Sequence, residues 1–174
     1  MRLLTAADTR LRRSTTWDGI IIHHTGIPTD SPKDQSAWAR FSETIAAWLT
    51  KKDENYVSAH YVINRDGSVI QLVDPMFRES FHAGVSSHWN PRTRSVVDDW
   101  NKHAIGIELV GDGNRLEYSP EQYRALADLC RDLMARFPSI HPQAILGHEQ
   151  IAPGRKTDPG KLFDWGLFRR LLHA

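Results

Sequence analysis

Side chains that can bind a metal or move a proton occur where several apolar runs of this sequence end. His23 and His24 close a run of glycine and isoleucines. His148 follows another apolar run and a glycine, and Asp158 lies ten residues later. In open α/β sheets, ligand-binding groups collect at the carboxyl ends of strands. These side chains are therefore candidates for one common site.

Two imidazoles and a carboxylate from separate segments form the donor set of an open zinc site, with a fourth position for water. The spacing is not a short-range metal signature such as HExxH. In the alternative interpretation, His148 hydrogen-bonds a neighbouring carbonyl and Asp158 stabilises a turn. Adjacent side chains of a strand point to opposite faces, so only one of His23 and His24 is expected to enter the site. Periodicity does not say which.

A carboxylate and a lysine could complete the chemistry of such a site. Glu108 interrupts an apolar run and shares a strand face with Gly106. A buried carboxylate is costly unless paired or ligated, so Glu108 could face a cavity and hold a catalytic water. In the alternative interpretation, Glu108 lies on an edge strand and faces solvent. Lys156 shares a face with Asp158 if that segment is extended, and could stabilise an oxyanion. Its alternative is an ordinary surface charge.

The elements that must position these residues alternate between strands and helices. Strands are predicted within 17–26, 103–111 and 143–149, and a hairpin within 56–74 turns at Asp66-Gly67. Helices are predicted within 34–52, 118–138 and 163–172, with Ser119 and Asp164 as N-caps. The run 81–101 is predicted as a long loop, and loops of that length inside compact domains are usually functional or disordered. We expect an α/β fold with a mixed central β-sheet flanked by helices.

Composition limits the classes of protein that need considering. The chain has 174 residues, 40% of them hydrophobic, and a formal net charge of +1, which indicates one folded domain with no electrostatic reason for nucleic-acid or membrane binding. The single Cys130 excludes an internal disulfide and suits a reducing compartment. The N-terminus lacks the apolar core of a secretory signal, so a cytoplasmic location is expected. The alternative to a cytoplasmic location is release by phage lysis or export by a non-standard route. A monomer is the favoured oligomeric state.

Five stretches, in order, resemble one known family. They are "IIIHHTG", "VSAHYVINRDGSVIQLV", "FHAGVSSHW", "IGIELVG" and "GHEQIAPGRKTDPG", and they span about residues 20–165. Together they are similar to the zinc-dependent N-acetylmuramoyl-L-alanine amidases of the amidase-2 family, which are related to peptidoglycan recognition proteins. The resemblance implies one zinc amidase domain over residues 1–174 with that family's fold.

The resemblance also implies roles for individual residues. It implies one Zn²⁺ per chain, held by His23, His148 and Asp158. It favours the first of the tandem histidines as the ligand, leaving His24 in a packing or supporting position. Glu108 matches the family's general base or water-positioning glutamate, and Lys156 matches the lysine that supports the transition state. His82 matches a position that lines the substrate groove, and is expected to contact substrate.

One departure from the family pattern indicates a branch. Phage lysozyme-type members carry a tyrosine at the position of Ala59. In lacking that tyrosine, the chain resembles the AmpD-type 1,6-anhydro-N-acetylmuramyl-L-alanine amidases of cell-wall recycling. The predicted reaction is hydrolysis of the amide between N-acetylmuramic acid, in its 1,6-anhydro form, and L-alanine of the stem peptide. Its partners are peptidoglycan fragments (muropeptides). The alternatives are a lytic amidase acting on polymeric peptidoglycan and a non-catalytic peptidoglycan-binding module, which typically lacks a zinc ligand.

Overall fold

The computed structural model of the chain describes residues 2–3, 9–12, 16–26 and 57–174. The helix predicted within 34–52 lies outside the described residues. The strands are β1 (Arg2–Leu3), β2 (Thr9–Leu11), β3 (Gly19–His24), β4 (Tyr61–Ile63), β5 (Val69–Gln71), β6 (Arg78–Ser80), β7 (Ser87–Asn90), β8 (Ser95–Asp98), β9 (Ala104–Leu109) and β10 (Ile145–Gly147). The helices are η1 (Trp100–Lys102), α2 (Pro120–Arg136), η2 (Pro142–Ala144), α3 (His148–Ile151) and α4 (Trp165–Leu172). None of the helices in these ranges is long and apolar enough to cross a membrane.

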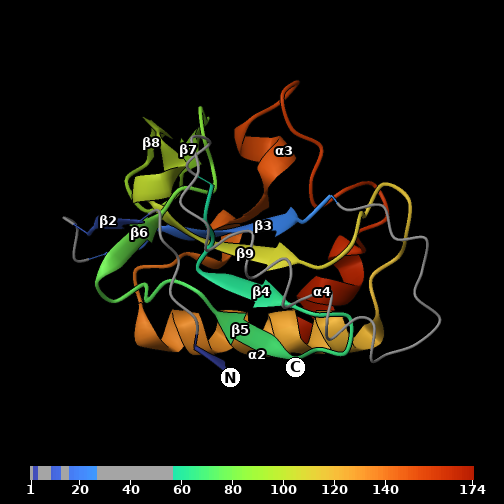
Figure 1. The fold of residues 1–174 in the computed structure, drawn as a ribbon. Coiled ribbons are helices and arrows are strands. Elements are labelled where there is room, and N and C mark those ends of the chain that lie inside the picture. Colours follow the sequence, from blue (N-terminus) through green and yellow to red (C-terminus); the bar gives the residue numbers. More distant parts are fainter. Residues whose placement is uncertain (1, 4–8, 13–15, 27–56) are drawn as a thin grey trace.

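Six strands form a central sheet in the order β1-β5-β4-β9-β3-β10. Strands β4, β9, β3 and β10 run parallel to one another, whereas β5 runs antiparallel to β4. The predicted mixed sheet is therefore confirmed. The hairpin of β4 and β5 is also confirmed, and Gly67 in its turn has a φ of +81°, a conformation that glycine adopts without steric cost. The parallel strands bring their carboxyl ends to one edge (Figure 1).

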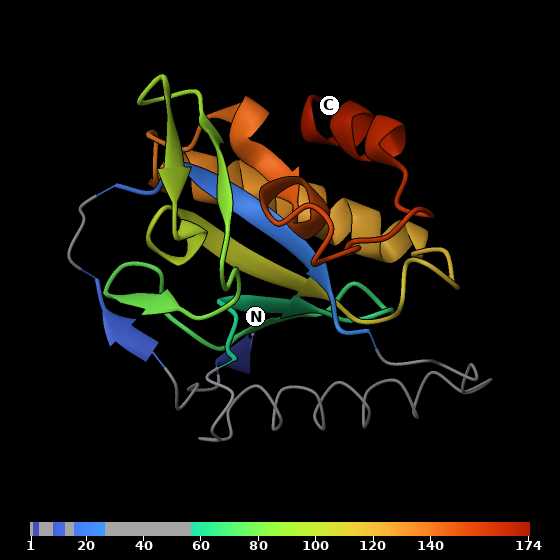
Figure 2. The same ribbon diagram turned by 90° about the horizontal axis from the view of Figure 1, so that it is seen from above.

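One face of the sheet packs against α2 and α4 (Figures 1 and 2). Side chains of β3 and β9 alternate, so every second residue enters this core. The apolar residues that meet there include Ile20, Ile22, Ile105, Ile107, Leu109, Leu126, Cys130, Leu133 and Phe137. Both predicted caps are confirmed: the Ser119 hydroxyl accepts from the Gln122 N–H, and the Asp164 carboxylate accepts from the Leu167 N–H.

The run 81–101 contains more regular structure than the sequence predicted. In place of one long loop, β7 and β8 form an antiparallel ribbon that is followed by η1. The Asn90 side-chain oxygen closes the turn between the strands by accepting from the N–H groups of Arg92 and Thr93. The outer face of the ribbon is exposed, with Trp89 52% and Val96 65% accessible. Apolar side chains on this solvated face therefore hid the alternation that would have predicted the two strands.

Candidate active site

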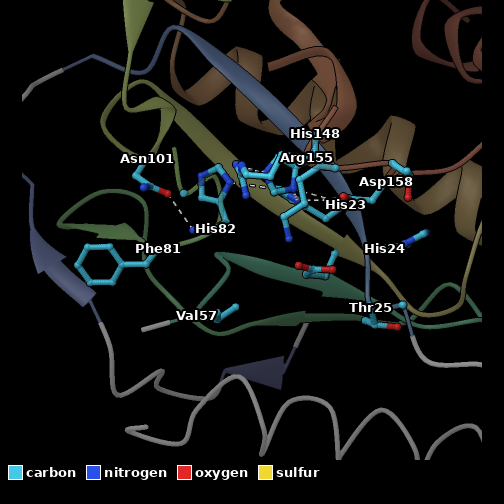
Figure 3. Close-up of a pocket in the computed structure, with 15 residues that line it drawn as sticks. His23, His24, Thr25, Val57, Phe81, His82, Asn101, His148, Arg155 and Asp158 are labelled. Carbon is cyan, nitrogen blue, oxygen red and sulfur yellow. Dashed lines mark hydrogen bonds and ion pairs between the residues drawn. The ribbon is translucent and has the colours of Figure 1, made fainter. Parts of the chain in front are cut away.

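The candidate site lies at the carboxyl ends of the parallel strands (Figure 3). His23 is near the end of β3, and Glu108 is its register partner on β9. His148 is the first residue of α3, directly after β10. Asp158 returns to this edge from the loop that follows α3, where its carbonyl oxygen accepts from the Glu149 N–H. The sheet therefore brings together residues that are distant in the sequence.

Three buried side chains converge at this edge. His23 Nδ1 lies 3.0 Å from His148 Nδ1 and 2.9 Å from Asp158 Oδ2, and His148 Nδ1 lies 3.0 Å from the same Oδ2. The three residues are 1%, 3% and 6% exposed. Among the described residues they form the group whose ligand atoms are close enough to hold one metal ion. The three atoms thus form a nearly equilateral triangle.

The outer nitrogen of His148 determines which ring nitrogen carries the proton. His148 Nε2 lies 3.0 Å from the carbonyl oxygen of Ala83, which can only accept a hydrogen bond. Arg155 Nη2 is 3.5 Å from the same nitrogen, a contact near the upper limit for a hydrogen bond. When the His148 ring carries a single N–H, that proton is therefore on Nε2, where the carbonyl oxygen accepts it. Its Nδ1 presents a lone pair to the triangle.

The same argument applies to His23 through a second imidazole. His82 Nε2 lies 3.0 Å from the carbonyl oxygen of Ala104, so His82 donates there and its Nδ1 is an acceptor. His23 Nε2 lies 2.9 Å from that Nδ1 and must donate to it. Burial, opposed by the charge of Asp158, lowers the pKa of His23 to about 4, so the ring is neutral at pH 7. His23 Nδ1 therefore also presents a lone pair.

In these tautomers the three atoms about 3 Å apart all present lone pairs, and they repel one another unless a cation lies among them. Two imidazole nitrogens and one carboxylate oxygen are a donor set found in catalytic zinc sites. Tetrahedral zinc with bonds of about 2.0–2.1 Å separates its ligand atoms by about 3.3 Å, close to the observed triangle. The residues present therefore fit a zinc ion with one position left open.

The tandem histidines point to opposite sides of the sheet, as strand alternation predicts. His23 enters the triangle, whereas His24 Nδ1 accepts a hydrogen bond of 3.1 Å from the backbone N–H of Gly113. Strand alternation leaves open which of the two enters the site. The family resemblance favours His23, and in the structure His23 lies in the triangle.

Glu108 lines the cavity beside the triangle, which has a volume of about 560 Å³. Part of its side chain is accessible, but Oε2 is buried and has no hydrogen-bond partner among the described residues. Burial, reinforced by the charge of Asp158 and opposed by Lys156, raises the pKa of Glu108 to about 8. An unpaired carboxyl with such a pKa can exchange a proton near neutral pH.

Lys156 and His82 line the same cavity. Lys156 is exposed, and its positive charge lowers the pKa values of both Glu108 and His23, which places the ammonium group within electrostatic reach of the site. His82 is 7% exposed, and its two ring nitrogens bond to His23 and to the Ala104 carbonyl. The expected contact between His82 and substrate therefore stays a prediction.

Sequence reasoning missed two residues that contact the site. Asn101 Oδ1 accepts from the backbone N–H groups of His82 and Ala83. Arg155 Nη2 donates to the carbonyl oxygens of Ala83 and Val85. These contacts reach main-chain atoms, which leave no pattern in the sequence. The position of Arg155 next to Lys156 was the one available signal.

Comparison with known proteins identifies relatives of this chain. The profile of the amidase-2 family, N-acetylmuramoyl-L-alanine amidase, matches residues 13–161. The chain is 46% identical over 116 residues to 1,6-anhydro-N-acetylmuramyl-L-alanine amidase AmpD from Salmonella typhimurium, covering 67% of this chain and 57% of that protein. It thus spans little more than half the length of that relative. It is 34% identical over 150 residues to AmpD from Haemophilus influenzae, covering 84% of this chain and 77% of that protein.

Solved structures share the fold. A selenomethionine derivative of AmpD superposes with a TM-score of 0.76 and 31% identity, covering 98% of this chain and 93% of that one. AmiD from Escherichia coli, solved with the substrate anhydro-N-acetylmuramic acid-L-Ala-D-gamma-Glu-L-Lys, superposes with a TM-score of 0.71 and 27% identity, covering 93% of this chain and 60% of that one. With the family profile matching most of its length, the chain belongs to the amidase-2 family of N-acetylmuramoyl-L-alanine amidases.

Proposed function

We propose that this chain is a zinc-dependent amidase domain that hydrolyses the bond between 1,6-anhydro-N-acetylmuramic acid and L-alanine in cell-wall recycling. The observation that carries this proposal is the triangle of three ligand atoms beside Glu108, whose buried Oε2 has no hydrogen-bond partner among the described residues. The similarity to the AmpD amidases supports the choice of substrate. His23, His148 and Asp158 would hold the zinc ion.

A zinc ion bound here would supply Lewis acidity, which lowers the pKa of water from about 16 to about 7 and polarises a carbonyl group. Glu108 would accept the proton of the attacking water and pass it to the leaving amine of L-alanine. Its pKa of about 8 suits both steps, because the group can take up and release a proton near pH 7.

Lys156 would stabilise the negative charge that develops on the carbonyl oxygen as water attacks. It lines the same cavity as Glu108 and the three candidate ligands. A positive group aimed at developing charge lowers the barrier because the interaction strengthens as the transition state forms. Charge stabilisation and proton transfer are thus assigned to two different side chains.

The test is turnover of a defined anhydro-N-acetylmuramyl peptide by purified protein, with release of free peptide as the readout. We expect cleavage that a chelator abolishes and that added zinc restores. Absence of zinc-dependent cleavage, both of this substrate and of intact sacculi, would reject the proposal. Cleavage of sacculi at a higher rate than of the soluble muropeptide would instead favour the lytic amidase.

A further inference from the structure

In both candidate ligand histidines, the ring nitrogen that points away from the triangle is Nε2. These two nitrogens hydrogen-bond to consecutive residues of the chain. His23 Nε2 meets His82 Nδ1 at 2.9 Å, and His148 Nε2 meets the carbonyl oxygen of Ala83 at 3.0 Å. We call residues 82–83 the support segment. His82 Nδ1 and the Ala83 carbonyl oxygen both act as acceptors, so each favours the tautomer in which a ligand ring is protonated on Nε2. The lone pair on Nδ1 of that ring then faces the triangle. One short stretch of chain therefore sets the tautomer of both rings.

The support segment is itself held by a buried side chain. Asn101 is 7% exposed, and its Oδ1 accepts from the backbone N–H groups of His82 at 2.9 Å and of Ala83 at 2.7 Å. One oxygen thus binds two successive main-chain donors. Arg155 Nη2 adds a bond of 2.7 Å to the Ala83 carbonyl on the side that faces the cavity. Figure 3 shows Asn101 on the far side of His82 from His23.

The His82 ring also needs a residue without a side chain beside it. A Cβ atom at Gly106 would lie 2.4 Å from Cγ of His82, closer than any real contact. Gly106 therefore leaves the space that the ring fills on this face of β9. Gly106, which shares a strand face with Glu108, thus helps to position His82.

We propose that His82 and Asn101 are positioning residues of the metal centre, and that the support segment fixes the ligand tautomers before the ion binds. This inference rests on the proposed function, since it concerns the zinc ion of that site. It gives His82 a role other than the substrate contact expected from the sequence. Both of its ring nitrogens are already bonded to protein atoms, which leaves neither for a substrate.

The first experiment compares His82→Phe with His82→Asn. Phenylalanine fills the space but offers no acceptor, whereas the side-chain oxygen of asparagine can occupy the place of Nδ1. Zinc affinity is measured by competition with a chelator of known affinity, without substrate. Outer-shell partners of metal ligands typically contribute roughly 10- to 100-fold in affinity, so we expect that loss in His82→Phe and partial recovery in His82→Asn.

The second experiment leaves every imidazole in place. Asn101→Ala removes the oxygen that holds the support segment and is also expected to lower zinc affinity, by roughly 10-fold. The matched control is His60→Asn. His60 is a buried imidazole whose ring centre lies 5.9 Å from that of His82, and it bonds to Ser80, the Gly106 N–H and the Arg78 carbonyl, not to a candidate ligand. The zinc affinity of the His60→Asn variant should differ from that of the wild type by less than about threefold.

A spectroscopic readout separates positioning from a general loss of structure. In zinc-free wild-type protein labelled with ¹⁵N-histidine, two-bond ¹H–¹⁵N correlations should show His23 and His148 protonated at Nε2. In His82→Phe we expect His23 to populate both tautomers while His148 stays unchanged. In the cobalt-substituted protein, the visible absorption bands should shift in His82→Phe and return toward the wild type in His82→Asn.

The outcomes distinguish failure of this inference from failure of the proposed function. If the wild type binds no zinc, the proposed metal centre is wrong. If the wild type binds zinc and His82→Phe binds it equally tightly with an unchanged His23 tautomer, the positioning role is overturned. The same holds if His82→Phe raises KM alone, which would make His82 a substrate contact, or if His60→Asn weakens zinc binding as much as His82→Phe.

Discussion

Buried carboxylates lie at both ends of the strand pair β3 and β9, and their surroundings differ. At the amino end, Asp18 is 1% exposed and accepts from Asn90 Nδ2 at 2.6 Å, from His103 Nδ1 at 2.9 Å and from Arg92 Nε. At the carboxyl end, Asp158 is 6% exposed and faces two imidazole nitrogens whose lone pairs point toward it. In the tautomers that the Nε2 hydrogen bonds favour, one carboxylate is surrounded by donors and the other faces acceptors.

The difference separates a structural cluster from a binding site. The donors around Asp18 compensate its desolvation, so this cluster stabilises the fold and ties the β7–β8 ribbon to β3. The atoms around Asp158 lack such compensation in the protein alone, and beside them the buried Oε2 of Glu108 has no partner among the described residues. Unsatisfied polar atoms are costly, and a folded protein retains them where a ligand completes the set.

The comparison is tested most strongly by the same substitution at both ends. Asp158→Asn removes the only anionic atom of the triangle. Zinc sites contribute roughly 10–16 kcal/mol over about four ligands, so loss of one ligand should weaken zinc binding roughly 100-fold or more. Turnover should fall with it. In zinc-free protein the introduced amide can donate to an imidazole, so the free energy of unfolding should not decrease.

Asp18→Asn should show the opposite pair of effects. It should lower the free energy of unfolding and leave the affinity for zinc unchanged, since Asp18 contacts none of the candidate ligands. Chelator competition and denaturant titration of both variants measure the two quantities. The distinction between the two ends fails if Asp18→Asn loses zinc, or if zinc-free Asp158→Asn is destabilised as much as Asp18→Asn.

Glu108→Gln tests whether the unpaired carboxyl serves chemistry and not metal binding. General acid–base groups contribute roughly 100- to 10,000-fold, so we expect kcat to fall by that range. Zinc affinity should stay close to that of the wild type, because Glu108 is outside the triangle. Steady-state kinetics and chelator competition on the same preparation check both statements. A kcat close to the wild-type value would remove Glu108 from the mechanism.

Lys156→Met tests the proposed stabilisation of the oxyanion. Loss of one such donor typically costs roughly 100- to 1000-fold, and we expect that decrease in kcat with little change in zinc affinity. Lys161→Met is the matched control, because Lys161 is an exposed lysine of the same loop outside the cavity lining. Equal kcat values for the two variants would assign Lys156 to the surface.

The positions of the strands and of the site edge could be predicted from the sequence. Apolar runs that end at His23, surround Glu108 and precede His148 predicted strands of a mixed sheet, and the structure has a strand at each of these places. The capping box at Ser119 and the cap at Asp164 were readable because capping is local chemistry between neighbouring residues. The family resemblance placed Asp158 near the histidines, which its ten-residue separation from His148 could not do.

The remaining features depend on contacts that a sequence pattern does not encode. Asn101 and Arg155 reach main-chain atoms, and main-chain atoms are the same at every position. The β7–β8 ribbon was predicted as a loop because its outer face is solvated, so apolar and polar residues do not alternate cleanly. The donors of Asp18 come from that ribbon and from His103, the residue before β9, so this cluster was not predicted either.

The smallest expected effect concerns the response of the Asp18 cluster to pH. Burial alone would raise the pKa of Asp18, but the hydrogen bonds from His103, Arg92 and Asn90 outweigh it and lower the pKa to about 2. The unfolded chain titrates near about 3.9, so the native state binds fewer protons between these values. The contribution of Asp18 is therefore complete above about pH 5 and is lost as the pH falls toward about 2, and it amounts to about 2 kcal/mol.

This loss is measured as a difference between two proteins, since other carboxylates titrate over the same range in both. Free energies of unfolding of wild type and Asp18→Asn are determined by denaturant titration across this pH range, with chelator present so that zinc release does not contribute. The wild type should be the more stable protein at neutral pH. The difference in the free energy of unfolding should narrow by about 2 kcal/mol as the pH falls below the pKa of free aspartate. Parallel curves would show that the donors around Asp18 do not favour its charged form. The two buried carboxylates would then not differ in the way that their neighbours indicate.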